Sequence, residues 1–309
     1  MSRYRNPFLF LVLAAAWGSA FMAIKAGLAY IPPVLFAALR YDVAGAVMLA
    51  YAFYATDRPI PRTRGEWAVV GVGATCMIAG YHALLFVGET DPAVTSAAAA
   101  VIVSLNPVLT TGFARLFLAD ERLTPVGIAG LFLGLAGVAI LAHPDPSHLL
   151  GGGAVAKLLI FGAAASFALG SVLTRRIDAS LPIETMEAWS MAGGALLMHA
   201  VSLGLGESFA AAVWNVRSIA ALGYLSVVAS ALGFLIYFDL LARLGAIEIN
   251  LVSYVAPVFA ALAGWAFLGE LPTVYTVVGF VVIFAGFLVV KRRAIRAELP
   301  RLRQFVSWP

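Results

Sequence analysis

Residues 7–27 read PFLFLVLAAAWGSAFMAIKAG, an apolar run in which Lys25 is the only charged side chain. Its length matches the roughly 20 apolar residues that an α-helix needs to cross the hydrocarbon core of a bilayer. The whole chain has the same character, because 62% of its residues are hydrophobic and 12% are charged. A soluble domain of this length could not cover so many apolar residues with a polar surface. The sequence therefore predicts a protein embedded in a lipid bilayer.

Nine further apolar runs follow along the 309 residues, each bounded by proline, glycine or charged residues. The ten expected spans are 7–27, 33–55, 66–88, 93–118, 124–142, 152–174, 182–205, 216–239, 245–268 and 273–290. Arg3 and Arg5 ahead of the first run are typical of a signal peptide. The run continues past Trp17 to Met22, however, and further spans follow, which favours an uncleaved first helix. We therefore predict an all-α membrane protein with ten transmembrane helices.

The distribution of basic residues predicts the orientation of these spans. Numbering the spans in order places sixteen of the 20 Lys and Arg residues on one side, and Lys25, Lys157 and Arg217 on the other. Arg40 lies inside the second span. Because cytoplasmic loops retain an excess of Lys and Arg, we expect both termini to be cytoplasmic. These residues form no exposed stripe interleaved with aromatics, so the expected partner is the lipid bilayer and not nucleic acid.

The two halves of the chain resemble each other at a shift of 149 residues. Pro33 then aligns with Pro182, and Glu121 aligns with Glu270. Since each half contains an odd number of spans, the second copy would be inserted upside down. Inverted repeats are a transporter architecture, with a substrate site near mid-membrane between the halves. We predict two inverted five-helix repeats around a central cavity, at 1–145 and 146–291, followed by a basic cytoplasmic tail at 292–309.

Several short motifs accompany this repeat. They are Trp17-Gly18-Ser19-Ala20-Phe21, Leu39-Arg40-Tyr41, Asn106-Pro107, Ala119-Asp120-Glu121-Arg122-Leu123-Thr124, Ala256-Pro257 and Leu268-Gly269-Glu270-Leu271-Pro272. In these motifs the chain resembles the drug/metabolite transporter superfamily, specifically its EamA-type ten-helix exporters, over nearly its whole length. The resemblance implies a bacterial inner membrane protein that exports amino acids or other metabolites and drugs. The aromatic-rich first half is similar to bacterial aromatic amino-acid exporters. Small multidrug transporters of the superfamily use a membrane-embedded glutamate in their first helix, which this chain lacks.

Two charged residues inside the second span are candidates for function. Arg40 and Asp42 lie at a depth where a charge costs about 2.5 to 3.5 kcal/mol, so each needs a partner or water. Two positions apart on a helix, they do not face one another. Arg40 is expected to form either a structural salt bridge or a substrate contact. Asp42 is the candidate for proton coupling.

Aromatic and small polar side chains within the spans form the remaining predicted substrate site. Aromatic rings offer flat apolar faces, and hydroxyl and amide groups can hold the ends of a zwitterion without a fixed charge. The alternative is that these groups pack helices together or sit at the membrane interface. The predicted substrate-binding residues are Trp17, Ser19, Arg40, Tyr81, His82, Ser104, Asn106, Ser166, Trp189, Tyr237 and Tyr254. Ser171, Asn250 and Ser253 belong to the wider set of small polar residues in the spans.

Prolines, glycines and one glutamate within the spans have expected structural roles. Pro107 and Pro257 are expected mid-span, where each removes a backbone hydrogen bond and could act as a hinge. Glu187 begins the seventh span and is expected to be solvated near the cytoplasmic surface. Glycine pairs in the fifth and tenth spans predict close packing of these helices, with a homodimer face as the alternative.

Taken with the resemblance, these features predict a secondary transporter that exports neutral amino acids, including aromatic and other apolar ones, by alternating access. The alternatives are an exporter of other small metabolites or drugs, and an exchanger of nucleotide sugars or phosphate esters, which would need several cavity cations. A channel would differ by showing neither saturation nor counterflow. An intramembrane aspartyl protease is disfavoured, because Tyr41-Asp42 has no partner Gly-x-Gly-Asp motif. We expect no cofactor and no metal, since Cys76 is the single cysteine and no His-Glu-x-x-His motif occurs.

Overall fold

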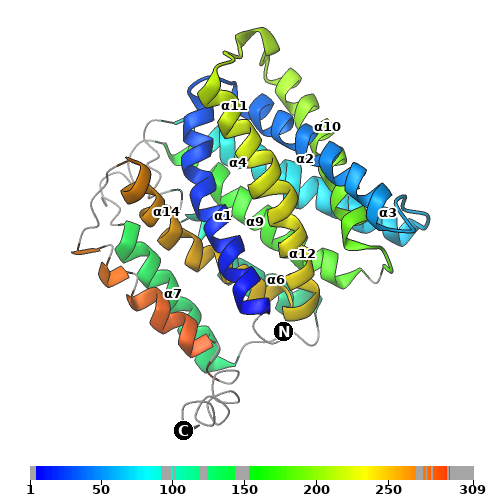
Figure 1. The fold of residues 1–309 in the computed structure, drawn as a ribbon. Coiled ribbons are helices and arrows are strands. Elements are labelled where there is room, and N and C mark those ends of the chain that lie inside the picture. The colour runs from blue at the N-terminus through cyan, green and yellow to red at the C-terminus, as the bar shows by residue number, and fades with distance from the viewer. Residues whose placement is uncertain are drawn as a thin grey trace, which may run out of the picture.

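The structure of the chain is a computed structural model that describes residues 5–91, 99, 102–118, 124–142, 153–177, 179–268, 274–275, 277–279, 281–290 and 292. Within these ranges the regular structure is helical and no strand occurs. The elements are α1 (Arg5–Leu28), α2 (Pro33–Ala55), α3 (Arg64–Val72), the π-helix η1 (Gly73–Gly80), α4 (Tyr81–Gly88), α6 (Asn106–Phe117), α7 (Pro125–Ala142), α9 (Ala154–Arg176), α10 (Ile183–Gly204), the short 3₁₀ helix η2 (Phe209–Ala211), α11 (Val216–Gly223), the π-helix η3 (Tyr224–Leu232), α12 (Gly233–Leu244), α13 (Ala246–Asn250) and α14 (Val252–Leu268). Another helical stretch covers 281–290. The expected all-α architecture is confirmed (Figure 1).

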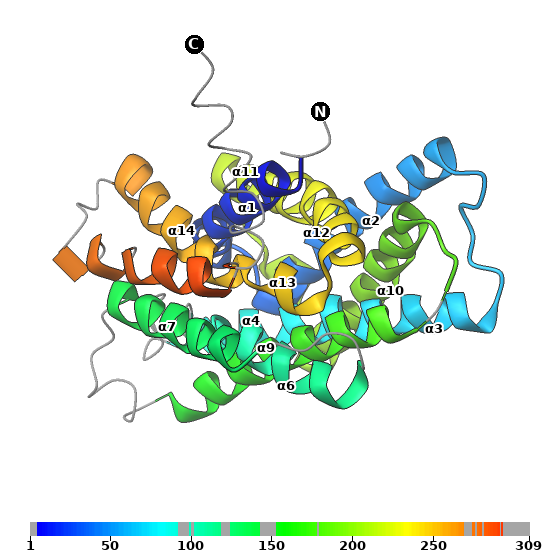
Figure 2. The ribbon, with the colours of Figure 1, turned by 90° about the horizontal axis from the view of Figure 1, so that it is seen from below.

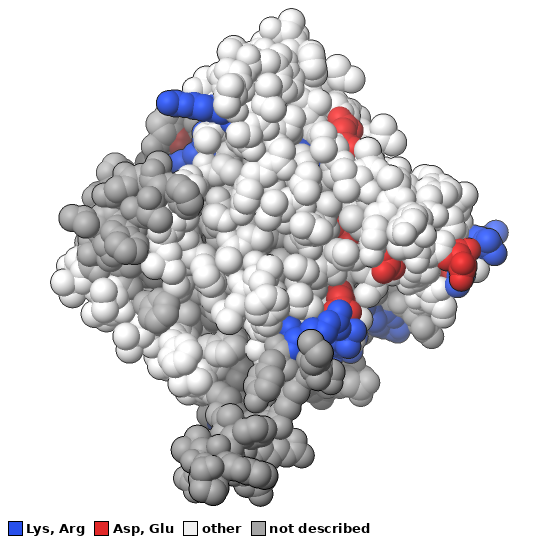
Figure 3. All heavy atoms as spheres, in the orientation of Figure 1, with Lys and Arg blue, Asp and Glu red and all other residues white. Residues whose placement is uncertain are grey.

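Several of these helices have the dimensions of membrane spans. Five are long and apolar enough to cross a bilayer: Arg5–Leu28, Pro33–Ala55, Arg64–Gly88, Ala154–Arg176 and Val216–Leu244. Shorter apolar helices lie at Pro125–Gly137, Ala246–Ala260 and Val277–Val290. Figure 3 shows that Lys, Arg, Asp and Glu are sparse among the described residues of one face of the molecule. Such a surface suits contact with lipid tails, in which charged groups are costly.

Helix starts follow from the local sequence. The residue before α2 is Pro32 and the residue before α10 is Pro182, and both have φ near −54° and ψ of 140°. Proline suits the start of a helix for two reasons. Its φ angle is already fixed at a value compatible with the helix, and backbone amides there have no partner within the helix, so the missing amide hydrogen of proline costs nothing. Helix α3 begins at a capping box, in which Thr63 accepts from the Glu66 amide and Glu66 accepts from the Thr63 amide.

The helix bounds repeat along the chain at the shift seen in the sequence. Helix α1 corresponds to α9, α2 to α10, and the π-helix η1 to the π-helix η3. Helices α2 and α10 pack against each other in opposite directions, since Asp42 contacts His199 near one end while Thr56 contacts Thr185 near the other. Equivalent helices that run antiparallel are what an inverted repeat requires. The inversion across a membrane and the count of ten spans stay predictions.

Two of the expected spans are interrupted. The backbone leaves the helical pattern at Ser104 and Leu105, and α6 begins at Asn106. Pro107 therefore lies in the first turn of a helix and not in mid-helix as expected, because the chain breaks just before it. Proline is tolerated there since its missing amide hydrogen would be unpaired anyway. In the second half α13 and α14 are separated at Leu251, and Pro257 lies inside α14.

The glycines of the fifth and tenth spans face each other within the chain. A Cβ atom on Gly137 would lie 2.5 Å from the backbone nitrogen of Ile283 and 2.9 Å from the carbonyl oxygen of Gly279. One on Gly130 would lie 3.0 Å from the carbonyl oxygen of Gly286. Helix α7 and the last helical stretch accordingly lie side by side in both views (Figures 1 and 2). These glycines serve internal packing, and a homodimer through the same two helices stays a prediction.

Gly18 in α1 gives a test of the packing between the two halves. A Cβ atom at Gly18 would collide with the carbonyl oxygen of Ala256 and would lie 2.8 Å from the Cβ of Phe259. We expect Gly18→Ala to force α1 and α14 apart and to cost about 1 to 3 kcal/mol, seen as a lower apparent melting temperature in detergent. Gly112→Ala is the matched control, because nothing lies within 4 Å of the added Cβ. Equal melting temperatures for the two variants would contradict this packing.

Candidate substrate cavity

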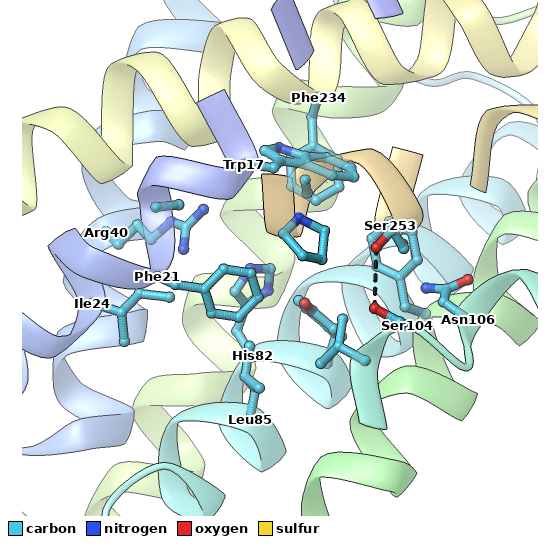
Figure 4. Close-up of a pocket in the computed structure, with 16 residues that line it drawn as sticks. Trp17, Phe21, Ile24, Arg40, His82, Leu85, Ser104, Asn106, Phe234 and Ser253 are labelled. Carbon is cyan, nitrogen blue, oxygen red and sulfur yellow. Dashed lines mark hydrogen bonds between the residues drawn. The ribbon is translucent and has the colours of Figure 1, made fainter. Parts of the chain in front are cut away.

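A cavity of about 720 Å³, counted up to and including its mouth, lies between the two halves. Its walls come from α1, α2, α4, residues 103–106, α9, α12 and α14. The large apolar lining side chains include Trp17, Phe21, Tyr81, Phe167 and Phe234. Figure 4 shows Trp17 and Phe234 above the cavity, and His82 and Leu85 below it. The site is therefore a mainly apolar pocket with a few polar groups, as small-molecule sites usually are.

Trp17 closes one end of this cavity. Its ring stacks on Tyr237 with centroids 5.3 Å apart and meets the edge of Phe167 at 5.9 Å. Its indole Nε1 donates a hydrogen bond of 3.0 Å to the carbonyl oxygen of Ala229 in η3. The indole can approach this closely because position 233 is glycine, whose added Cβ would lie 2.8 Å from Nε1. Trp17 is thus held in place by both stacking and a hydrogen bond.

The second half contains an equivalent contact with different chemistry. Ser166 lies 149 positions after Trp17, and its hydroxyl donates a bond of 2.8 Å to the carbonyl oxygen of Cys76 in η1. Position 80 is glycine, and a Cβ there would lie 2.5 Å from the Ser166 hydroxyl. The first helix of each half therefore hydrogen-bonds to the π-helix of the other half. Only the tryptophan of this pair lines the cavity.

Among the lining residues that the structure describes, only Arg40 carries a permanent charge. It is 3% exposed, and its Nε donates a hydrogen bond of 2.6 Å to the hydroxyl of Ser230. Its guanidinium carbon lies 5.2 Å from the ring centroid of Tyr41. Within the described ranges, no carboxylate forms an ion pair with Arg40 and its two terminal nitrogens make no hydrogen bond. Figure 4 shows the guanidinium pointing toward the cavity.

His82 is fixed by two hydrogen bonds. Its Nδ1 lies 2.9 Å from the carbonyl oxygen of Ile78, and its Nε2 lies 2.9 Å from the hydroxyl of Tyr41. Since a carbonyl oxygen can only accept, Nδ1 carries the hydrogen, and Nε2 can accept from Tyr41. The arrangement satisfies a neutral imidazole. Tyr81 packs edge-on against His82, with ring centroids 4.7 Å apart.

Uncharged polar groups lie on the side of the cavity opposite to Arg40 (Figure 4). The hydroxyl of Ser104 donates to the carbonyl oxygen of Ser253 at 3.2 Å, and these two residues are 149 positions apart. Asn106 accepts a bond of 3.0 Å from the hydroxyl of Thr110 through its side-chain oxygen. Ser104, Asn106 and Ser253 lie at or next to the points where the helices are interrupted. Such unwound segments are tolerated at membrane depth where they line a cavity.

A buried polar network lies next to Trp17, outside the cavity. Asn250 donates to the hydroxyl of Ser171 at 2.9 Å and to the carbonyl oxygen of Ala246 at 2.9 Å. Tyr237 donates to the side-chain oxygen of Asn250 at 3.3 Å. Tyr237, Asn250 and Ser171 are all completely buried. The stacking of Tyr237 on Trp17 connects this network to the cavity wall.

The structure brings together part of the predicted substrate site. Trp17, Arg40, Tyr81, His82, Ser104, Asn106 and Pro257 line the cavity. The other predicted residues lie elsewhere: Ser19 lies 2.6 Å from the Tyr224 hydroxyl, Ser166 contacts Cys76, Trp189 donates to the carbonyl of Pro59, Tyr237 supports Trp17, and Tyr254 donates to the carbonyl of Leu131. Pro107 is not among the lining residues either.

Three lining aromatics were not predicted. Phe21 lies four positions after Trp17, so helical spacing alone places it on the same face of α1. Phe167 and Phe234 have no such signal in the sequence. Many phenylalanines occur in the spans, and only the packing of the two halves selects these two.

Asp42 does not line the cavity. Its side chain is 42% exposed on the outer side of α2, where Oδ2 lies 2.7 Å from Nε2 of His199 on α10. Its role in proton coupling stays a prediction, but the described contact is one between two helices at the outer surface.

Glu187 differs from expectation. It is completely buried, and neither carboxyl oxygen has a hydrogen-bond partner in the part of the chain that the structure describes. The prediction of a solvated glutamate is wrong, because the start of α10 packs against other parts of the chain, including the loop between α2 and α3. Thr185 donates to the carbonyl of Arg58 at 2.7 Å, and Trp189 donates to the carbonyl of Pro59 at 2.9 Å.

Comparison with known proteins identifies the fold and the family. The profile of the EamA-like transporter family matches residues 6–142 and again residues 155–292. The chain belongs to the EamA-like transporter family. The same family profile thus matches each half of the chain in turn. The resemblance to EamA-type exporters is thus confirmed at the level of the family.

Individual relatives cover most of the chain. An uncharacterized transporter, YvbV of Bacillus subtilis, is 28% identical over 95% of this chain and 94% of its own length. The uncharacterized inner membrane transporter YedA of Escherichia coli is 31% identical over 88% of this chain and 86% of its own length. A solved crystal structure, 24% identical in sequence, superposes with a TM-score of 0.76 over 95% of this chain and 99% of that chain. The sequences support a membrane transporter, and the superposition shows the fold.

The Asp42–His199 contact can be tested by a double-mutant cycle. We expect Asp42→Asn and His199→Gln each to lower the apparent melting temperature slightly, and the double variant to be no worse than either single one, because both remove the same contact. Counterflow without an imposed proton gradient should be unchanged. A variant Asp42→Asn that loses only gradient-driven transport would instead make Asp42 the proton site.

Proposed function

We propose that this protein is a secondary transporter that exports neutral amino acids, including aromatic and other apolar ones, across a bacterial inner membrane by alternating access. Both termini would be cytoplasmic, as the basic residues predict. The observation that carries the proposal is the composition of the cavity wall. Its described residues include several aromatic rings, with Arg40 as their one permanent cation on one side and hydroxyl and amide groups on the opposite side.

This wall suits a small molecule with an aromatic or aliphatic body and few charges. Trp17, Tyr81 and Phe167 offer ring faces and edges, and aromatic contacts are worth about 0.5 to 1.5 kcal/mol each beyond the area that they bury. Phosphate esters and nucleotide sugars carry several negative charges and are usually held by clusters of Arg and Lys. Among the described lining residues Arg40 stands alone in this respect. Export of other apolar metabolites or drugs is the second candidate, since the same wall would accept them.

The buried network beside Trp17 is consistent with alternating access. Tyr237 and Ser171 in the buried network correspond, at the shift of 149, to Gly88 and Met22 in the first half. Glycine and methionine cannot form the hydrogen bonds that join Tyr237 and Ser171 to Asn250. The first half therefore has no counterpart of this network, so the two halves would close the cavity in different ways during a transport cycle.

The proposal is tested by uptake and counterflow in liposomes, with a panel of amino acids and with or without a proton gradient. Saturable counterflow of neutral amino acids, strongest for large apolar or aromatic ones, is the expected result. Transport confined to phosphorylated or multiply charged compounds would contradict the proposal. Flux without saturation or counterflow would indicate a channel.

Substitutions of lining residues should reduce transport per amount of folded protein. We expect Trp17→Ala to reduce saturable transport at low substrate concentration about tenfold, which corresponds to a loss of about 1.4 kcal/mol of contact energy. Tyr81→Ala and Asn106→Ala should act in the same direction. Trp214→Ala is the matched control, because Trp214 is exposed and lies outside the cavity. A Trp17→Ala protein that transports like the control would exclude this cavity as the substrate site.

A further inference from the structure

We infer that Arg40 is a binding site for the substrate's carboxylate, and that the transported class extends to aromatic monocarboxylates without an amino group. The inference rests on the proposed function and narrows it. It makes the carboxylate the recognised group and the amino group dispensable.

Among the described residues, three other arginines form ion pairs, and Arg40 differs from them. Arg5 and Arg243 both contact Asp239, at 3.1 Å and 2.9 Å, and Arg58 contacts Glu66. Those pairs lie near helix ends, where water is close. Arg40 is more deeply buried than any of these three arginines, yet it faces the cavity without a carboxylate. The fold places an anion beside each of these other cations and leaves the position beside Arg40 open.

An unpaired cation in this position favours an anionic ligand. Removing a charge from water costs several kcal/mol, which a hydrogen-bonded partner of opposite charge offsets. The Nε of Arg40 donates a hydrogen bond of 2.6 Å to the hydroxyl of Ser230, and this bond orients the guanidinium plane. The two terminal nitrogens then remain for a ligand, and paired N–H donors match the two oxygens of a carboxylate. A single carboxylate satisfies the site.

The described lining of the cavity offers no carboxylate that could pair with an ammonium. None of its described lining residues is Asp or Glu, because Asp42 lies on the outer side of α2 and Glu187 is buried elsewhere. The uncharged acceptors at Ser104, Asn106 and Ser253 lie across the cavity from Arg40 (Figure 4). In an amino acid the amino and carboxylate groups are separated by one carbon atom, so an amino group beside a bound carboxylate meets aromatic rings instead. Such contacts are worth about 0.5 to 2 kcal/mol and are not essential for binding.

The test uses four probes that share one phenyl ring. They are L-phenylalanine, 3-phenylpropionate, L-phenylalaninamide and 2-phenylethylamine, measured by ligand-induced thermal stabilisation in detergent at pH 8 and by inhibition of counterflow. We expect L-phenylalanine and 3-phenylpropionate to bind within about tenfold of each other, since the amino group adds only about 1.4 kcal/mol or less. The amide and the amine should bind at least tenfold more weakly than phenylalanine.

Variants of Arg40 and its neighbour complete the test. Arg40→Gln should remove the preference for the two carboxylates, and Arg40→Lys, which keeps the charge, should restore part of it. Ser230→Ala retains the guanidinium and should weaken both carboxylates equally. If Arg40→Gln does not fold, the Lys and Ala variants still report the preference.

The outcomes separate this inference from the proposed function. Phenylalanine binding without 3-phenylpropionate binding, or equal binding of phenylalaninamide and phenylalanine, would overturn the inference and leave amino-acid transport standing. Binding of 3-phenylpropionate without phenylalanine would support the carboxylate site and overturn amino-acid transport. Binding of none of the four probes would overturn both.

Discussion

In lipid, a backbone carbonyl group that leaves the α-helical hydrogen-bond pattern needs a donor from within the protein, because no water is present to donate to it. This constraint joins the two halves of the molecule. The third span of each half contains a π-helix, and a side chain from the first helix of the other half donates to one of its carbonyl groups. In one case the donor is the indole of Trp17, and in the other it is the hydroxyl of Ser166. The same contacts place Trp17 at the end of the cavity.

The difference between equivalent positions gives the cavity its chemistry. A duplicated fold supplies two similar walls, but Trp17 corresponds to Ser166, Arg40 to Trp189 and Tyr81 to Ser230. The first-half members of these pairs, Trp17, Arg40 and Tyr81, line the cavity, and their second-half counterparts do not. Ser230, the small member of one pair, holds Arg40 instead. Binding is therefore asymmetric within a repeated framework, which is consistent with one substrate orientation relative to the two halves.

Features that depend on sequence periodicity were predictable, and those that depend on contacts between the halves were not. The apolar runs predicted α1, α2, α9 and α10 within a few residues, and the resemblance predicted the family. The spacing of residues along the sequence could not show that Asp42 faces outward or that Glu187 is buried, since both depend on how segments distant in sequence pack. The helix breaks at Ser104 and Leu251 could not be predicted from hydrophobicity either, because the apolar runs of the sequence continue through both positions.

The most direct test of this account is an experimental structure of the protein with bound 4-bromophenylalanine, in which the bromine is located by its anomalous scattering. We expect the carboxylate within hydrogen-bond distance of the terminal nitrogens of Arg40, and the brominated ring among Trp17, Tyr81 and Phe167. A ligand with its amino group toward Arg40, or one bound outside the cavity, would contradict the account.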